Sequence, residues 1–304
     1  AQTRVADWTG WDANFAPLLD GSAFADLPRA GTPIPDMYLP FHENWPGDIH
    51  TGYKFDYPYP ATPEAYDAMV KRHALEAAPI EQAFTDDYAD RFVAVMAEFA
   101  KHIRAKGWTR TSFQVYLNNK YYWKRPENGE IRQGSAWWLL DEPNHRDDVR
   151  ALAYYAELMA RGLADYPDVP VIYRTDISRI FWIRDILAGQ IDLNCVSKFF
   201  YTKNRYLLNN RDRFGQAIWN YGSLNNVRDT NVAMQGWCWR AWLNGGDGLL
   251  PWDAVSGGVA GWDQASQLAA FYGGAKFDKN EPMASMRLKA LRRGQQDEIG
   301  RAHV

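Results

Sequence analysis

Two adjacent carboxylates, Asp141 and Glu142, close the apolar segment 136–140, which reads Ala-Trp-Trp-Leu-Leu. Apolar surroundings raise the pKa of a carboxyl group, which suits a general acid that works near neutral pH. Pro143 disfavours the helical region for the residue before it, so we expect Glu142 to be extended. The alternative is that these acids only cap a following helix. We predict that the pair is catalytic.

Short apolar segments that alternate with helical patterns must position this pair. Expected strands lie at residues 37–41, 112–117, 136–140, 171–175, 192–198, 217–221 and 248–252. Expected helices lie at residues 12–19, 86–106, 146–165, 181–188, 205–214 and 231–244. Strands that are apolar on both faces and joined by helices are typical of a buried parallel sheet. We therefore predict an α/β fold, a TIM-like (β/α)8 barrel whose first strand, near residues 3–8, is short or missing.

The organisation of the chain follows from its lack of linkers. No low-complexity or charged stretch interrupts it, so we predict one catalytic domain over residues 1–299 and a tail at 300–304. An open doubly wound sheet is the alternative, but no Gly-rich phosphate loop follows a predicted strand. The chain starts without Met, which is compatible with a trimmed product. The residues leave localisation open, and we expect a secreted or periplasmic bacterial protein.

Further candidate site residues come from the predicted strand ends, because barrel enzymes build their active sites at the carboxyl ends of their strands. We expect these side chains to bind substrate: His42, Asn118, Lys120, Tyr173, Lys198, Tyr201, Asn220, Tyr221 and Trp252. They offer hydrogen-bonding groups for hydroxyls and flat rings for sugar faces, and the chain has 14 Trp and 17 Tyr. This composition favours a carbohydrate substrate.

The reaction route depends on where a second carboxylate lies. A retaining glycosidase commonly pairs its acid with a nucleophilic carboxylate about 5 Å away. The seventh predicted strand ends in Trp-Asn-Tyr at residues 219–221 and offers no acid, which favours a 2-acetamido group of the substrate as nucleophile. Glu142 would protonate the leaving oxygen, and Asp141 would hold the acetamido N–H. Two alternatives stay open: a non-catalytic carbohydrate-binding barrel, or a two-carboxylate glycosidase that uses Glu142 with Glu43, Asp176 or Asp253.

Four segments together resemble the catalytic barrel of glycoside hydrolase family 123. They are residues 20–24 (DGSAF), 138–143 (WLLDEP), 237–252 (WCWRAWLNGGDGLLPW) and 285–294 (SMRLKALRRG). The resemblance implies a TIM-like barrel that releases terminal β-linked N-acetylgalactosamine from oligosaccharides or glycoconjugates. It also implies exo action, retention through an oxazoline intermediate, and no metal or other cofactor. It maps the acid pair of that family onto Asp141 and Glu142. The usual β-sandwich domain does not precede the barrel here, and a preference for N-acetylglucosamine stays open.

Composition excludes several other classes of function. The net charge is −3, so no basic excess points to nucleic acid or to an anionic membrane surface. No apolar run approaches the roughly 20 residues that a membrane-spanning helix needs. Cys195 and Cys238 are the two cysteines, and we expect both to be buried thiols. The six His show no spacing typical of metal ligands.

Overall fold

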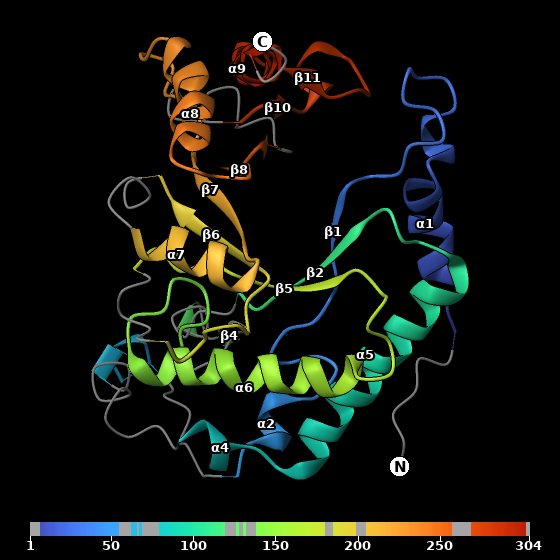
Figure 1. Cartoon of the computed structure of the whole chain (residues 1–304), viewed down its shortest axis with the longest axis vertical. Coiled ribbons are helices and arrows are strands. Elements are labelled where there is room, and N and C mark those ends of the chain that lie inside the picture. Colours follow the sequence, from blue (N-terminus) through green and yellow to red (C-terminus); the bar gives the residue numbers. More distant parts are fainter. Residues whose placement is uncertain are drawn as a thin grey trace. The chain divides into compact units, whose positions relative to one another are not determined.

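The protein is described from a computed structural model over residues 7–54, 62–65, 67–68, 79–118, 126–127, 130–131, 138–179, 185–198, 205–256 and 269–301. It divides into two compact units, Ala1–Leu193 and Asn194–Val304. Figure 1 labels the elements of both. Each unit is described by itself.

The first unit is built on three parallel strands that follow one another in chain order. β1 (Asp36–Tyr38) pairs with β2 (Ser112–Tyr116), and β2 pairs with β5 (Val171–Thr175). The register sets Met37 opposite Phe113, and Phe113 opposite Val171. Parallel strands need crossover connections, and helices supply them here.

The expected strand at residues 136–140 is wrong in its described part. Residues 136 and 137 lie outside the described residues, while Trp138, Leu139 and Leu140 are buried but belong to no strand. The β2–β5 pairing leaves no place between those strands for another. The apolar residues 138–140 therefore reflect burial in the core and not a position in the sheet.

Two long helices cover one face of this sheet (Figure 1). α5 (Asp86–Lys106) begins after Thr85, whose side chain accepts the Tyr88 N–H, and ends at Gly107, which is left-handed at φ 69°. α6 (Arg146–Leu163) packs against α5, and the hydroxyls of Tyr88 and Tyr155 lie 2.7 Å apart between them. The predicted bounds of α5 are confirmed, and those of α6 are two residues too long.

Several shorter elements complete the first unit. The helix predicted at 12–19 is confirmed within α1, and residues 7–8 before it form no strand. The remaining elements are α1 (Thr9–Asp20), η1 (Ser22–Phe24), α2 (Ile49–Gly52), α4 (Ile80–Ala83), β3 (Pro126–Glu127) and β4 (Glu130–Ile131). The helix expected at 181–188 falls partly outside the described residues, and its described part, 185–188, forms turns.

The second unit holds the later strands and helices. β7 (Ala217–Ser223) pairs in parallel with β8 (Gly248–Trp252). α8 (Val232–Leu243) packs against α9 (Met286–Arg301), and Trp237, Cys238 and Leu291 belong to their shared core. The other elements are β6 (Leu193–Ser197), α7 (Arg205–Phe214), β9 (Val255–Ser256), β10 (Phe271–Tyr272), η6 (Gly274–Phe277) and β11 (Met283–Ala284).

The predicted α/β class is confirmed. The largest sheet has six strands, and the pairings β1–β2, β2–β5 and β7–β8 are all parallel. A closed ring of eight strands is not present among the described residues, so the full barrel stays a prediction. Cys195 and Cys238 are buried free thiols, as expected.

Candidate functional site

A polar row crosses the three strands of the first unit on one face. Successive side chains of a strand point to opposite faces, so Asp36 and Tyr38 share a face, as do Gln114 and Tyr116. The register sets Tyr38 opposite Gln114 and Tyr116 opposite Arg174. Gln114 donates its amide N–H to Asp36 at 2.9 Å. The row therefore reaches from β1 to the end of β5.

Arg174 is the buried centre of this row. It is 1% exposed and binds Asp176 through two bonds, Nε to Oδ1 and Nη2 to Oδ2, each 2.8 Å. Its guanidinium lies 4.3 Å from the ring centroid of Tyr116 and donates to the Tyr38 hydroxyl. Two-bond pairing to a carboxylate is the strongest geometry available to Arg, so Asp176 is fixed in direction just after β5.

Tyr116 links Asp176 to the predicted catalytic Asp141. Its hydroxyl lies near the carboxylates of both residues, and their charges influence its pKa. Burial, and then the negative charge of Asp176, raise the pKa of Tyr116 well above its usual value. The phenol therefore stays protonated and acts as a donor to carboxylate.

Opposing effects act on the pKa of the Asp176 carboxyl. Burial raises the pKa of its carboxyl, and the charge of Asp141 adds to the rise, while Arg174 opposes it. A nearby carboxylate disfavours the ionised form of Asp176, whereas the positive charge and the two hydrogen bonds of Arg174 favour it.

The predicted catalytic pair, Asp141 and Glu142, lies beside the end of β5. The Glu142 N–H donates to the Asp176 carbonyl at 3.1 Å, Asp141 is 8% exposed, and Glu142 is half-buried. The expectation of an extended Glu142 is wrong, because its φ is 55°, in the left-handed region. Such a conformation costs of order 1–3 kcal/mol and recurs at functional sites. The bond to Asp176 holds it in place.

The helix-capping alternative for the acid pair is resolved by Asp148. Asp148 accepts the backbone N–H groups of Leu139 at 2.9 Å, Asn144 at 3.1 Å and His145 at 2.9 Å. His145 is the residue that precedes the first turn of α6. The capping carboxylate of α6 is thus Asp148, which also fixes the segment that carries Asp141 and Glu142.

The other predicted residues of the first unit lie in different surroundings. His42 is half-buried, its Nδ1 accepts the Asn44 N–H at 3.1 Å, and burial lowers its pKa. Asn118 is exposed, and Lys120 lies outside the described residues. Tyr173 points to the helix side of the sheet, where its buried hydroxyl donates to the Leu152 carbonyl at 2.9 Å. That position does not support a sugar contact for Tyr173.

The remaining predicted substrate residues belong to the second unit. Lys198 lines a cavity of this unit, and Asn220 is hydrogen-bonded to Trp237 in the wall of the same cavity. Tyr221 is half-buried on β7, and Trp252 is 62% exposed at the end of β8. Tyr201 lies outside the described residues.

The three acids predicted as possible second carboxylates lie in different places. Asp176 lies near Asp141, whose charge adds to the effect of burial in raising the pKa of Asp176. Glu43 is fully buried next to α5 and α6, where burial raises the pKa of Tyr88 and of Tyr155 and the charge of Glu43 adds to the rise. Asp253 is exposed in the second unit. Asp176 is thus the acid that the structure places near the pair.

Sequence reasoning missed Tyr38, Gln114 and Tyr116 as site residues. Their signal was the period-two spacing of polar side chains within otherwise apolar strands.

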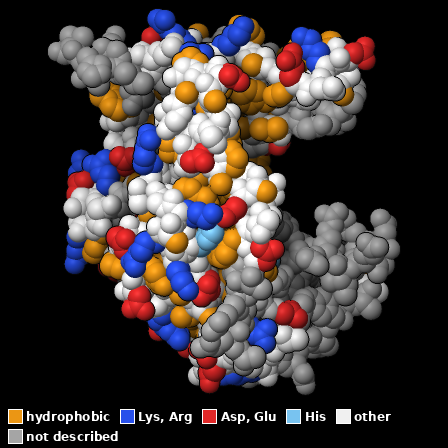
Figure 2. Space-filling model, turned by 90° about the vertical axis from the view of Figure 1, so that its right-hand side faces the viewer, with side chains coloured by type: hydrophobic (Ala, Val, Ile, Leu, Met, Phe, Trp, Pro, Cys, Tyr) orange, Lys and Arg blue, Asp and Glu red, His pale blue; other side chains and the backbone are white. Residues whose placement is uncertain are grey.

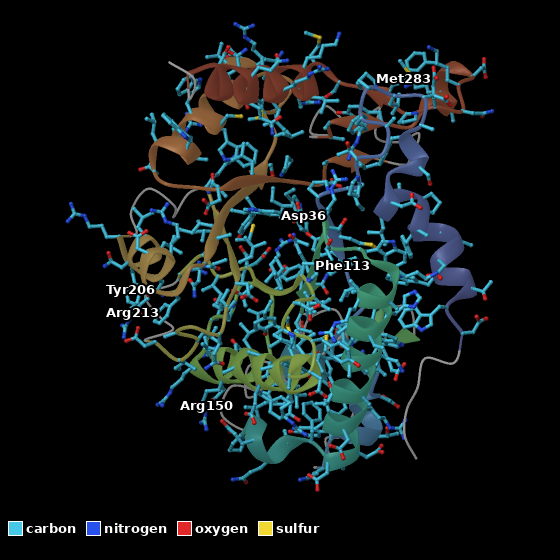
Figure 3. The ribbon with its side chains drawn as sticks, turned by 45° about the vertical axis from the view of Figure 1, so that its right-hand side comes forward. Asp36, Phe113, Arg150, Tyr206, Arg213 and Met283 are labelled. Carbon is cyan, nitrogen blue, oxygen red and sulfur yellow. The ribbon has the colours of Figure 1, made fainter. Side chains whose placement is uncertain are left out.

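Figure 3 labels Asp36 and Phe113 on neighbouring strands, and Arg150, which projects outward from α6. A cavity of about 850 Å³ lies on that helix side, between α6 and residues 186–192, and none of its lining residues belongs to the Arg174 row.

On the face shown in Figure 2, the basic and acidic side chains of the described residues are interspersed. No described helix is both long and apolar enough to cross a bilayer. Within the described ranges, no three His, Cys, Asp or Glu side chains gather as metal ligands.

Comparisons with known proteins give little. No family model matches the chain, and neither does any curated protein. Among solved structures, a GH5-4 broad specificity endoglucanase from an uncultured bacterium is 11% identical over 69% of this chain and 71% of that chain, with a TM-score of 0.32. A likeness of this strength supports no statement about the fold or function of this chain. Function therefore rests on the residues of the site.

Proposed function

We propose that the chain is an exo-acting glycoside hydrolase that releases terminal β-linked N-acetylgalactosamine by a substrate-assisted, retaining route. The observation that carries the proposal is the separation of roles among three neighbouring acids. Asp176 is bound through both oxygens by Arg174, and Asp141 and Glu142 are the two acids to which we assign the chemistry. The resemblance to glycoside hydrolase family 123 supports the same pair.

The geometry suits different roles for the two acids. Asp141 is buried beside the Tyr116 hydroxyl, and in this role its carboxylate accepts the acetamido N–H of the substrate. Glu142 is more exposed and is turned by its left-handed backbone. In this role it protonates the leaving oxygen, and its carboxylate then takes a proton from the water that opens the oxazoline.

The first experiment measures kcat/KM on 4-nitrophenyl β-N-acetylgalactosaminide. Glu142→Gln and Asp141→Asn should each lower it by about 10²-fold or more, the range for a lost acid or base. Asp87→Asn, in an exposed acidic pair at the start of α5, is the matched control and should retain activity. Full activity in either site variant overturns the proposal.

A second measurement separates proton donation from misfolding. The loss in Glu142→Gln should shrink when 4-nitrophenol is replaced by 2,4-dinitrophenol, because the better leaving group needs less protonation. The loss in Asp141→Asn should not shrink, because its partner is the acetamide. Equal rescue of both variants contradicts these assigned roles.

A substrate panel that differs only at C2 and C4 tests the sugar. We expect the plain galactoside to be cleaved far more slowly than the acetamido sugar. Comparable rates would instead favour the two-carboxylate route, for which the closeness of Asp176 to Asp141 is the specific observation. Faster cleavage of the gluco epimer would make the enzyme an N-acetylglucosaminidase. Sugar binding without cleavage of any aryl glycoside would indicate a non-catalytic carbohydrate-binding protein.

A further inference from the structure

A separate cavity of about 330 Å³ lies wholly within the second unit. Lys198, after β6, and Asn225, after β7, form one side. Met234, Trp237 and Arg240 line it from α8, and their spacing of three residues sets them on one helix face. The volume lies at the lower end of the range for small-molecule sites, about 300–1,000 Å³, and fits a monosaccharide.

Asn225 brings an unsatisfied acceptor to this cavity. It is 6% exposed, and within the described residues its Oδ1 has no hydrogen-bond partner. The other end of the amide is occupied, because Nδ2 lies 3.1 Å from the Asn226 carbonyl, 3.4 Å from the Asp229 carbonyl and 3.3 Å from Asn231 Oδ1. A flipped amide would turn its oxygen toward three acceptors. The orientation is therefore fixed, and Oδ1 is the atom of this amide that still lacks a donor among the described residues.

The side chain of Arg287 holds the backbone at Asn225. Arg287 donates from Nε to the Asn225 carbonyl at 2.6 Å and from Nη1 to the Tyr272 hydroxyl at 2.8 Å. Arg287 itself is buried. A preformed acceptor on a fixed backbone loses little order when a ligand binds.

Two cations border the same cavity. The Lys198 ammonium donates to the Ser223 carbonyl at 2.8 Å and lies 5.4 Å from the ring centroid of Trp237. The Trp237 indole N–H is in turn bonded to Asn220 Oδ1, so Asn220 supports this wall. Arg240 is exposed at the rim, and no salt bridge engages its guanidinium in the described part of the chain.

The described residues that line the cavity carry more positive than negative charge. Among them, Asp229 is the acid, and Lys198 and Arg240 are the cations. Burial, and then the charge of Arg240, lower the pKa of Lys198. Two like charges held near each other attract an anion, and one carboxylate leaves room for a single negative charge.

We propose that this cavity binds a monosaccharide-sized polyol that carries one negative charge, placed between Lys198 and Arg240, with a hydroxyl that donates to Asn225 Oδ1. The charged group is a carboxylate, as in a uronic acid, or a sulfate ester, since both present one charge and several acceptor oxygens. The site uses neither Asp141 nor Glu142, so it can be tested whether or not the proposed function holds, although Lys198 is also one of the residues predicted to bind the hydrolase substrate.

Calorimetric titration of the whole chain at low salt tests the proposal with four probes. Galacturonate and galactose 6-sulfate supply the two kinds of anion, galactose supplies hydroxyls without charge, and propionate supplies charge without hydroxyls. We expect at least one anionic sugar to bind tenfold or more tightly than galactose and than propionate. The stronger anionic sugar identifies the charged group. Equal binding of galactose or propionate, or no binding of any probe, overturns the proposal.

Variants locate the binding in the cavity. Arg240→Gln, at an exposed position where the fold tolerates change, should weaken the anionic sugar about tenfold or more. Lys198→Met keeps the apolar stem and should weaken it similarly. Arg228→Gln, an exposed change in the loop beside the cavity, should have no effect. Unchanged affinity in Arg240→Gln, or loss of binding in Glu142→Gln, would place the sugar elsewhere and refute the site.

Discussion

Replacement of Asp148, a buried residue in the first turn of α6, by Ala should destabilise the first unit. The carboxylate accepts three backbone N–H groups, those of Leu139, Asn144 and His145. Loss of a capping acceptor costs about 0.5–2 kcal/mol. The Leu139 N–H lies in the buried core, and a buried donor without a partner costs about 1–3 kcal/mol more. We therefore expect a total of about 1.5–5 kcal/mol.

Urea unfolding followed by circular dichroism measures this cost. Asp147→Ala is the matched control, because Asp147 lies in the same first turn and its side chain is 53% exposed, 4.0 Å from Arg150. A surface change of that kind should stay within about 0.5 kcal/mol. If Asp148→Ala cost no more than Asp147→Ala, the three bonds would not hold the segment and the reasoning would fail.

The pH dependence of Asp148 adds a signed test. Burial raises the pKa of its carboxyl above the usual value, although three N–H donors oppose the rise. An acid whose folded pKa is raised contributes stability at low pH and loses it as pH rises through the folded pKa. As the pH rises from the unfolded pKa of Asp148 to its folded pKa, the wild type should therefore lose stability relative to Asp148→Ala. A gain over the same interval would show that the three donors outweigh burial.

Other expected outcomes concern the Arg174 row and the α5–α6 contact. Tyr116→Phe keeps the ring beside the guanidinium and should lower kcat/KM on the aryl acetamido sugar about 10- to 100-fold. The reason is that a hydrogen bond to a charged group is worth about 1.5–3 kcal/mol. Unchanged kcat/KM would contradict this expectation. Arg174→Met should cost about 3–5 kcal/mol at neutral pH, and less under acid, where Asp176 is protonated; a pH-independent cost would refute the pairing. Gly162→Ala should destabilise by about 1–3 kcal/mol, because an added Cβ would lie 2.6 Å from a Met side-chain carbon of α5, whereas Gly10→Ala, with open space around it, should not.

Helices and strands were predictable where the pattern had one physical meaning. The predicted bounds of α5 are confirmed because a capping Thr85, a periodic apolar face and a left-handed Gly107 agree with one another. The segment 138–140 misled because a buried apolar run looks the same whichever acceptor takes its N–H groups. Here the acceptor is the side chain of Asp148 for Leu139, not a neighbouring strand.

Local rules also failed where a distant partner compensated for strain. Pro143 disfavours a helical or turned Glu142, and its preference is worth only a small energy. The Asp176 carbonyl lies more than thirty positions along the chain, yet it accepts the Glu142 N–H at 3.1 Å. No pattern around residue 142 reveals that acceptor. The acid pair itself was predictable from its types and its apolar approach, but its direction was not.

The polar row shows what sequence contains and what only pairing adds. Asp36 with Tyr38, and Gln114 with Tyr116, stand two apart in apolar strands, so their shared faces can be read without a structure. Their contact with Arg174 depends on register, because a slip of one residue would turn every side chain to the other face. The observed register sets Tyr116 opposite Arg174, across more than fifty intervening residues. That single pairing puts the phenol ring 4.3 Å from the guanidinium and carries its hydroxyl to the acid pair.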